Sequence, residues 1–149
     1  MFRRPLVHSG LFVLLLVAAP ARTQADEFID VGDLPGGSFF SIAKGVSADG
    51  SVVVGDSSGV NGTEAFRWTQ TGGMIGLGAF PGGVIFQSRA NGVSADGSVI
   101  VGYGTNVDGN KEAFRWTQAD GMVGLGDLLG GGFESQAYGV SADGSVIVG

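Results

Sequence analysis

The sequence predicts an all-β fold of four-stranded antiparallel repeat units, arranged as a partial β-propeller-like array of about two and a half blades after an N-terminal signal peptide. One motif returns at intervals of 46, 47 or 48 residues, which is the mark of a repeat architecture. Each copy contains short apolar runs separated by Gly, Pro and Asp-Gly turn signals. Beyond the signal, no segment shows the 3.6-residue apolar period of an amphipathic helix.

Residues 1–25 are predicted to be a secretory signal peptide. Two arginines near the start precede an apolar run at 10–19, and mostly small residues follow at 20–25. The run is shorter than the ~20 residues that a permanent membrane span needs, so no permanent span is expected. Cleavage is predicted after Ala25, with Ala21 as the second choice. The protein would then be secreted or displayed on the cell surface.

The composition of the mature chain excludes several classes of chemistry. Loss of the signal removes three of the eight basic residues and none of the fourteen acidic ones, so the net charge changes from −6 to −9. An acidic chain is repelled by phosphate backbones, and we expect no nucleic-acid partner. The chain has no cysteine, and its one histidine, His8, leaves with the signal. Zinc sites built on His and Cys, His-dependent nucleophiles and disulfides are therefore excluded, and no cofactor is predicted.

The first two strands of the unit are predicted at residues 42–47 and 51–55, on either side of Asp49-Gly50. An Asp-Gly pair between two apolar runs is typical of a type I′ hairpin, in which both central residues have positive φ. The segment that holds both strands recurs almost unchanged, at residues 45–55, 92–102 and 139–149.

The third strand is predicted at residues 64–69 and the fourth at 74–77. Because side chains alternate along a strand, Phe66 and Trp68 share one face of the third strand. Ala65, Arg67 and Thr69 share the opposite face. We expect Trp68 and its counterpart Trp116 to be buried at equivalent positions. The two segments recur at residues 112–118 and 121–126.

The repeat length and two local patterns favour a propeller-like arrangement of these units. Propeller blades of four strands take about 40–50 residues. The run 52–54 is all valine and thus apolar on both faces, as in a sheet that is covered on both sides. Ala43 and Gly45 keep one face of the first strand small, which permits close approach of backbones near an axis. An open stack of the same sheets is the alternative.

The phase of the repeat predicts an incomplete β-repeat domain at residues 26–149. Residues 28–34 align with 122–128, so the mature chain is expected to open with a fourth strand that completes a blade, as in known propellers. The last copy stops after its second strand. Apolar sheet faces exposed at both ends would invite self-association.

The repeat resembles the bacterial extracellular HAF repeat family. The Ala-Phe-Arg-Trp segments at 65–68 and 113–116 are similar to the core of that repeat, with Glu64 and Glu112 where the family usually has histidine. Residues 80–83 and 93–102 match its two other stretches. The resemblance implies secretion or surface display and no established activity.

No catalytic, cofactor-binding or metal-ligating residue is predicted. Asp49, Asp96 and Asp143 recur in the Asp-Gly turns, where calcium binding is one interpretation, but Asp in such a turn usually hydrogen-bonds its own backbone. Glu64 and Glu112 are expected to form outward salt links with the arginines three residues later, which contribute little stability.

Two repeat positions vary while their neighbours stay constant, and they are the predicted recognition surface, against the alternative of neutral drift. One position is occupied by Ile42, Arg89 and Gln136, and the other by Lys44, Asn91 and Tyr138. Positions that drift in this way should be exposed and dispensable for the blade.

The sequence thus favours a secreted or surface-displayed, non-catalytic repeat module that is structural or binds an extracellular protein or glycan. The alternative is a secreted carboxylate-dependent hydrolase acting on extracellular polysaccharide. Such an enzyme needs two carboxylates across one cleft. Convergent carboxylates in a pocket would favour the alternative.

Overall fold

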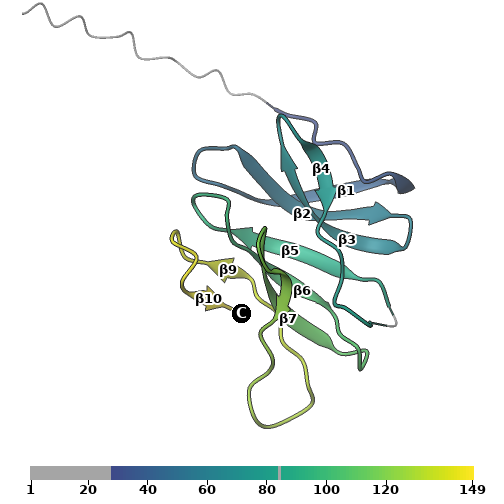
Figure 1. Cartoon of the computed structure of the whole chain (residues 1–149), viewed down its shortest axis with the longest axis vertical. Helices are drawn as coiled ribbons and strands as arrows, with labels where there is room; N and C mark the ends of the chain where they lie inside the picture. Colours follow the sequence, from purple (N-terminus) through teal and green to yellow (C-terminus); the bar gives the residue numbers. More distant parts are fainter. Residues whose placement is uncertain (1–27, 84) are drawn as a thin grey trace, which may run out of the picture.

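The computed structural model describes residues 28–83 and 85–149, and the predicted signal peptide lies outside this range (Figure 1). The described residues form ten β-strands and no helix, so the predicted all-β class of antiparallel four-stranded units is confirmed. The described part of the chain accordingly holds no helix long and apolar enough to cross a membrane.

The strands form two four-stranded sheets and a two-stranded sheet, each an antiparallel meander in which sequence neighbours pair. The first sheet contains β1 (Gly36–Val46), β2 (Val52–Gly59), β3 (Gly62–Thr69) and β4 (Gly73–Gly76). The second contains β5 (Ser88–Val93), β6 (Ile100–Thr105), β7 (Lys111–Thr117) and β8 (Gly121–Gly124). The third contains β9 (Gly139–Val140) and β10 (Ile147–Val148).

The first two strands are longer than the sequence pattern indicates. β1 begins at Gly36 rather than at residue 42, and β2 continues through the polar stretch that ends at Gly59. Gly59 pairs with Gly62 across the β2–β3 hairpin, so this polar stretch is held by backbone pairing and not by an apolar pattern. Apolar alternation alone therefore underestimates the length of these two strands.

The prediction of a type I′ turn is wrong. Gly50 has a φ of 74°, but no described residue other than glycine has a positive φ, so Asp49 does not adopt the conformation that a type I′ turn needs. Gly50 N instead donates to Ser47 O at 3.0 Å, which closes a turn with only its last residue left-handed. The turns that end at Gly97 and Gly144 repeat this geometry.

The first strand of each sheet lies beside the first strand of the next sheet. Figure 1 shows this for β5, which lies between the first sheet and β9. Ala48 N donates to Ala95 O at 2.9 Å, and Ala95 N donates to Ala142 O at 3.0 Å, so the turns are bonded from sheet to sheet. A Cβ placed on Gly45 would lie 3.6 Å from the Cα of Gly92. The small first-strand residues therefore permit the predicted approach of backbones.

The main core lies between the first and second sheets and contains Phe114 and Trp116 of the second unit. Phe66 and Phe114 are fully buried, and Trp68 and Trp116 are also buried, as predicted. The apolar cluster joins residues from both sheets and from the loop after β4, namely Val52, Val54, Ala65, Leu77, Phe80, Ala90, Ile100, Phe114 and Trp116.

Residues 28–34, predicted as a fourth strand, form no strand. A fourth strand pairs with a third, and the described chain has no third strand before this segment. Leu34 is nevertheless buried, and its N–H donates to Ser57 Oγ at 3.0 Å, so the end of the segment is fixed on the first sheet.

Candidate functional site

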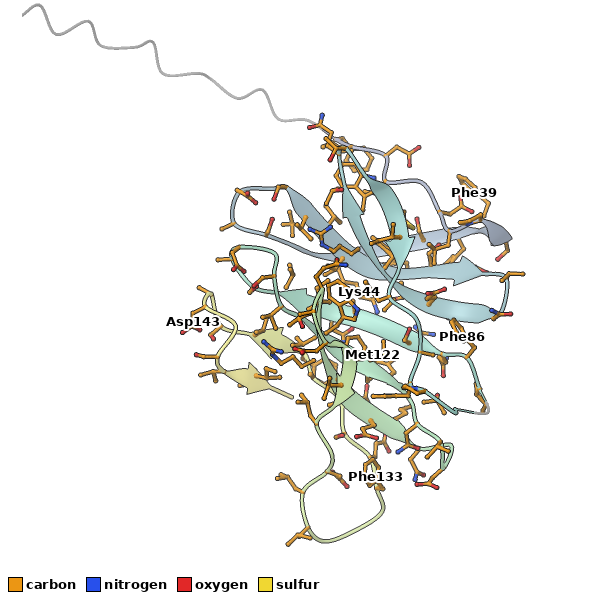
Figure 2. The ribbon with its side chains drawn as sticks, in the orientation of Figure 1. Phe39, Lys44, Phe86, Met122, Phe133 and Asp143 are labelled. Atoms are coloured by element: carbon orange, nitrogen blue, oxygen red, sulfur yellow. The ribbon has the colours of Figure 1, made fainter. Side chains whose placement is uncertain are left out.

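The recurring turn aspartates brace their own turns. Asp49 Oδ1 accepts hydrogen bonds from Ser51 N at 3.0 Å, Ser51 Oγ at 2.8 Å and Ser47 Oγ at 2.7 Å. Asp96 and Asp143 repeat the arrangement, and Figure 2 shows Asp143 at the margin of the molecule. Within 28–83 and 85–149, no three His, Cys, Asp or Glu side chains gather in a way that could hold a metal ion.

These hydrogen bonds make the turns sensitive to acid. The N–H of Ser51 and the hydroxyls of Ser47 and Ser51 lower the pKa of Asp49 to about 2 from 3.8, and serine hydroxyl and N–H donors do the same to Asp96 and Asp143. A carboxylate whose pKa is lower in the folded state stabilises the fold at pH values above its unfolded-state pKa. This stabilisation is lost as the pH falls from about 4 to about 2.

We expect the melting temperature to fall through this window, and to fall less in a variant with all three aspartates changed to Asn. Asparagine keeps the acceptor oxygen of the turn but carries no titrating charge. Thermal melts recorded by circular dichroism between about pH 5 and pH 2 measure the difference. An identical pH profile for both proteins would contradict the assignment.

Glu64 and Glu112 do not form the predicted links to the arginines three residues later. Glu64 Oε1 accepts from Gly78 N at 2.8 Å, and Glu112 Oε1 accepts from Gly126 N at 3.2 Å. Each carboxylate therefore fixes the loop that leaves the fourth strand. A Cβ on Gly76 would lie 2.1 Å from Glu64 Oε1, so the glycine provides the space for this bond.

The two variable repeat positions are not uniformly exposed. Ile42, Lys44 and Tyr138 are exposed as predicted, but only 26% of the Lys44 side chain and 33% of the Arg89 side chain face solvent, and Arg89 is half-buried. Both face the fully buried Asp56: Lys44 Nζ contacts Oδ1, and an Arg89 guanidinium nitrogen lies 3.7 Å from Oδ2. These contacts with a buried carboxylate argue against the prediction that the positions of Lys44 and Arg89 are dispensable for the blade.

The same positions connect the sheets. Lys44 Nζ donates to Asn91 Oδ1 at 3.4 Å, and Asn91 Nδ2 donates to the carbonyl of Ala137 at 2.9 Å. Lys44 and Asn91 therefore join the first sheet to the second and the second sheet to the third. The second unit has Tyr103 where the first has Asp56, so this ion cluster belongs to one interface only.

Three serines that the sequence analysis missed lock each unit to the preceding one. Ser41 Oγ donates to Gly32 O at 2.6 Å, and Ser88 and Ser135 donate to Gly78 O and Gly126 O, each at 2.5 Å. Ser88 and Ser135 also accept the backbone N–H of the third-strand alanine at 3.0 Å. Their regular spacing of 47 residues was the signal that could have found them.

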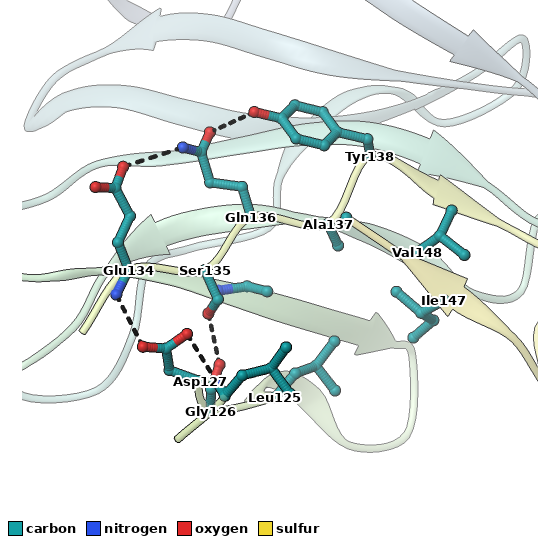
Figure 3. Close-up of a pocket in the computed structure, with 13 residues that line it drawn as sticks. Leu125, Gly126, Asp127, Glu134, Ser135, Gln136, Ala137, Tyr138, Ile147 and Val148 are labelled. Carbon is teal, nitrogen blue, oxygen red and sulfur yellow. Dashed lines mark hydrogen bonds between the residues drawn. The ribbon is translucent and has the colours of Figure 1, made fainter. Parts of the chain in front are cut away.

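A pocket of about 500 Å³ lies where the second sheet meets the third (Figure 3). Its walls are the loop after β8, the segment before β9, and the end of the chain. The lining residues are Ala113, Leu125, Gly126, Asp127, Leu128, Glu134, Ser135, Gln136, Ala137, Tyr138, Ile147, Val148 and Gly149.

Two carboxylates line this pocket, and both already have hydrogen-bond donors. Asp127 accepts from Leu128 N at 2.8 Å and from Glu134 N at 3.2 Å. Glu134 Oε1 accepts from Lys111 Nζ at 3.3 Å and Gln136 Nε2 at 3.2 Å. Figure 3 shows the bonded row of Glu134, Gln136 and Tyr138 along one wall and Asp127 on the other. Asp127 thus closes the loop between β8 and β9 on itself, and Glu134 anchors a polar row.

Fold and site together define an all-β protein of repeated antiparallel sheets with a polar-rimmed apolar pocket between the second and third sheets. No protein-family model, curated protein or solved structure matches the chain.

Proposed function

We propose that the chain is a secreted or surface-displayed, non-catalytic β-repeat module that is structural or binds an extracellular protein or glycan. The observation that carries this proposal is the use of recurring polar side chains for the same structural bonds in successive units. The turn aspartates, the third-strand glutamates and the interlocking serines all bond the backbone of the array. This use supports a scaffold role for these side chains. A surface that binds a partner would then be formed by other residues.

We further propose that the sheets are the blades of a propeller-like array. Support comes from the adjacent first strands and from the backbone bonds that link Ala48, Ala95 and Ala142 in sequence. The resemblance to the HAF repeat family implies an extracellular location.

Expression of the full chain in a bacterial host tests the export step. We expect the exported protein to begin at Asp26 or, failing that, at Arg22, by N-terminal sequencing and intact mass. Replacing Leu15 by Arg breaks the apolar core of the signal and should keep the protein in the cytoplasm with its leader attached. A wild-type product that keeps Met1 in the cytoplasm would overturn the export proposal.

The hydrolase alternative draws on one observation, the presence of Asp127 and Glu134 in the same pocket. The protein should release no reducing ends from extracellular polysaccharides above the level of its Asp127→Asn/Glu134→Gln variant, because both carboxylates serve structural bonds. Activity that disappears in the double variant would replace the module with a retaining or inverting glycosidase.

A further inference from the structure

We propose that a second pocket, between Arg67 of the first sheet and two turns of the second sheet, binds a sugar unit that carries a carboxylate. We call it the inter-unit pocket. The ligand is one unit of an acidic extracellular polysaccharide, with its carboxylate on Arg67. This inference deepens the proposed function by naming a glycan class, but it is tested by binding alone, so its failure would leave export and the scaffold role standing.

The inter-unit pocket is formed wholly by the first two units. Its walls are Arg67 on β3, the turn 96–99 before β6, and residues 115–119 at the end of β7. Its volume is about 470 Å³. Sites for small molecules usually take about 300–1,000 Å³, so a sugar unit is within the range that such a pocket holds.

Arg67 points toward the second sheet. Ala65 belongs to the apolar cluster that also contains Trp116 of β7, so this face of β3 packs on the second unit. Since side chains alternate along a strand, Arg67 lies on the same face, two residues further on. Arg67 is half-buried there, which places its guanidinium at the interface of the two units.

Arg67 differs from the other cations of the described chain in having no carboxylate partner. The other basic residues at 28–83 and 85–149 all form ion pairs, namely Lys44, Arg89, Lys111 and Arg115. None of these ion pairs includes Arg67. A guanidinium presents a planar fork of donors that matches a carboxylate at two points. Arg67 is therefore the cation of this pocket that is left for an acidic ligand.

The remaining walls suit a sugar with a single negative charge. The carboxylate of Asp96 is engaged by Ser94 and Ser98, and its charge disfavours ligands with several negative charges at this wall. Gln118 is exposed, and its amide offers both donors and an acceptor to sugar hydroxyls. Trp116 adds an apolar wall. Together these groups fit a ring that carries hydroxyls and one carboxylate.

The acidic net charge of the chain, −6, does not conflict with this ligand. Interactions between exposed charges are largely screened beyond about 8 Å at physiological ionic strength, whereas the contact with Arg67 is direct. Nucleic acids instead depend on many phosphate contacts made at once. A pocket with one unpaired guanidinium meets the first requirement and not the second.

Isothermal calorimetry of the full chain tests the proposal, with trimers of galacturonic, mannuronic and guluronic acid as probes. We expect at least one acidic trimer to bind saturably. The neutral trimer of the parent sugar should bind at least about tenfold more weakly, because it lacks the charged partner of Arg67. Absence of saturable binding by all three acidic trimers would overturn the proposal, as would equal affinity for the neutral trimer. Tighter binding of a triglutamate peptide would also overturn it, in favour of an acidic protein segment.

Variants of the chain locate the site. Arg67→Gln should bind the acidic trimer at least about tenfold more weakly and leave binding of the neutral trimer unchanged. Lys111→Gln is the matched control, because it removes a cation that lies outside the pocket, and it should bind like the wild type. Equal affinity for the wild type and Arg67→Gln, or an equal loss in both variants, would overturn the proposal.

A second variant serves if Arg67→Gln melts early. Gln118 is exposed, so Gln118→Ala should melt like the wild type. It should bind the acidic trimer about threefold to tenfold more weakly, the usual effect of losing a hydrogen bond. Unchanged affinity in this variant would overturn the assignment of the pocket.

Discussion

Replacing Trp116 by Ala is expected to lower the free energy of unfolding by roughly 3–5 kcal/mol, the usual cost of removing a core aromatic side chain. Trp116 lies on β7 but belongs to the cluster that also contains residues of the first sheet and Phe80 from the loop after β4. Its removal leaves a cavity where two sheets meet, and the surrounding residues are held by strand pairing on both sides. The site can therefore collapse only partly, which keeps the cost high.

Chemical denaturation followed by circular dichroism measures this effect, and the chain supplies a matched control. Phe39 is an aromatic residue on β1 that is 88% exposed, and Figure 2 shows it at the outer end of the first sheet. Phe39→Ala should change stability by no more than about 0.5 kcal/mol, as expected of an exposed position. Equal losses for both variants would mean that burial of the indole is not the cause.

The sequence predicts the strands well where the chain is apolar and repeats itself. The Ala-Phe-Arg-Trp segments and the Asp-Gly turns place the third strands and the first hairpins, because alternation and turn chemistry are local properties. The predicted position of this turn is right, but the predicted turn type is wrong. The Asp-Gly pair marks a turn, but the carboxylate of Asp49 is bonded by Ser47 and Ser51, which selects a different backbone conformation.

The candidate sites were harder to predict, because they depend on which units lie side by side. Glu64 was expected to pair with a residue of its own strand, yet it bonds the loop after β4 at 14 residues' distance. The pocket cannot be read from local patterns at all, since its lining residues match buried core residues of the preceding unit. Only the packing of the sheets shows that Leu77 and Phe80 are buried whereas the equivalent residues, Leu125 and Leu128, are exposed.

The Asp56 cluster is the clearest case of a feature created by the array. Asp56 lies on β2, Lys44 on β1 and Arg89 on β5, so the charges meet only when the second sheet packs on the first. Neither carboxylate oxygen of Asp56 accepts a hydrogen bond in the described part of the chain, so these two cations are its charge partners. Figure 2 shows Lys44 at the centre of the molecule, between the two sheets.

A variant that loses both cations, Lys44→Met/Arg89→Met, should therefore be destabilised by roughly 3–5 kcal/mol, the cost of leaving a buried charge without its partners. Methionine keeps the length and apolar stem of both side chains, so lost packing contributes little. Adding Asp56→Asn removes the buried charge and should restore most of the stability, because replacing a whole buried ion cluster is often neutral. Urea denaturation of the wild type, the double variant and the triple variant measures both steps. A double variant within about 1 kcal/mol of wild type would show that Asp56 is solvated in solution and that its ion pairs do not join the sheets.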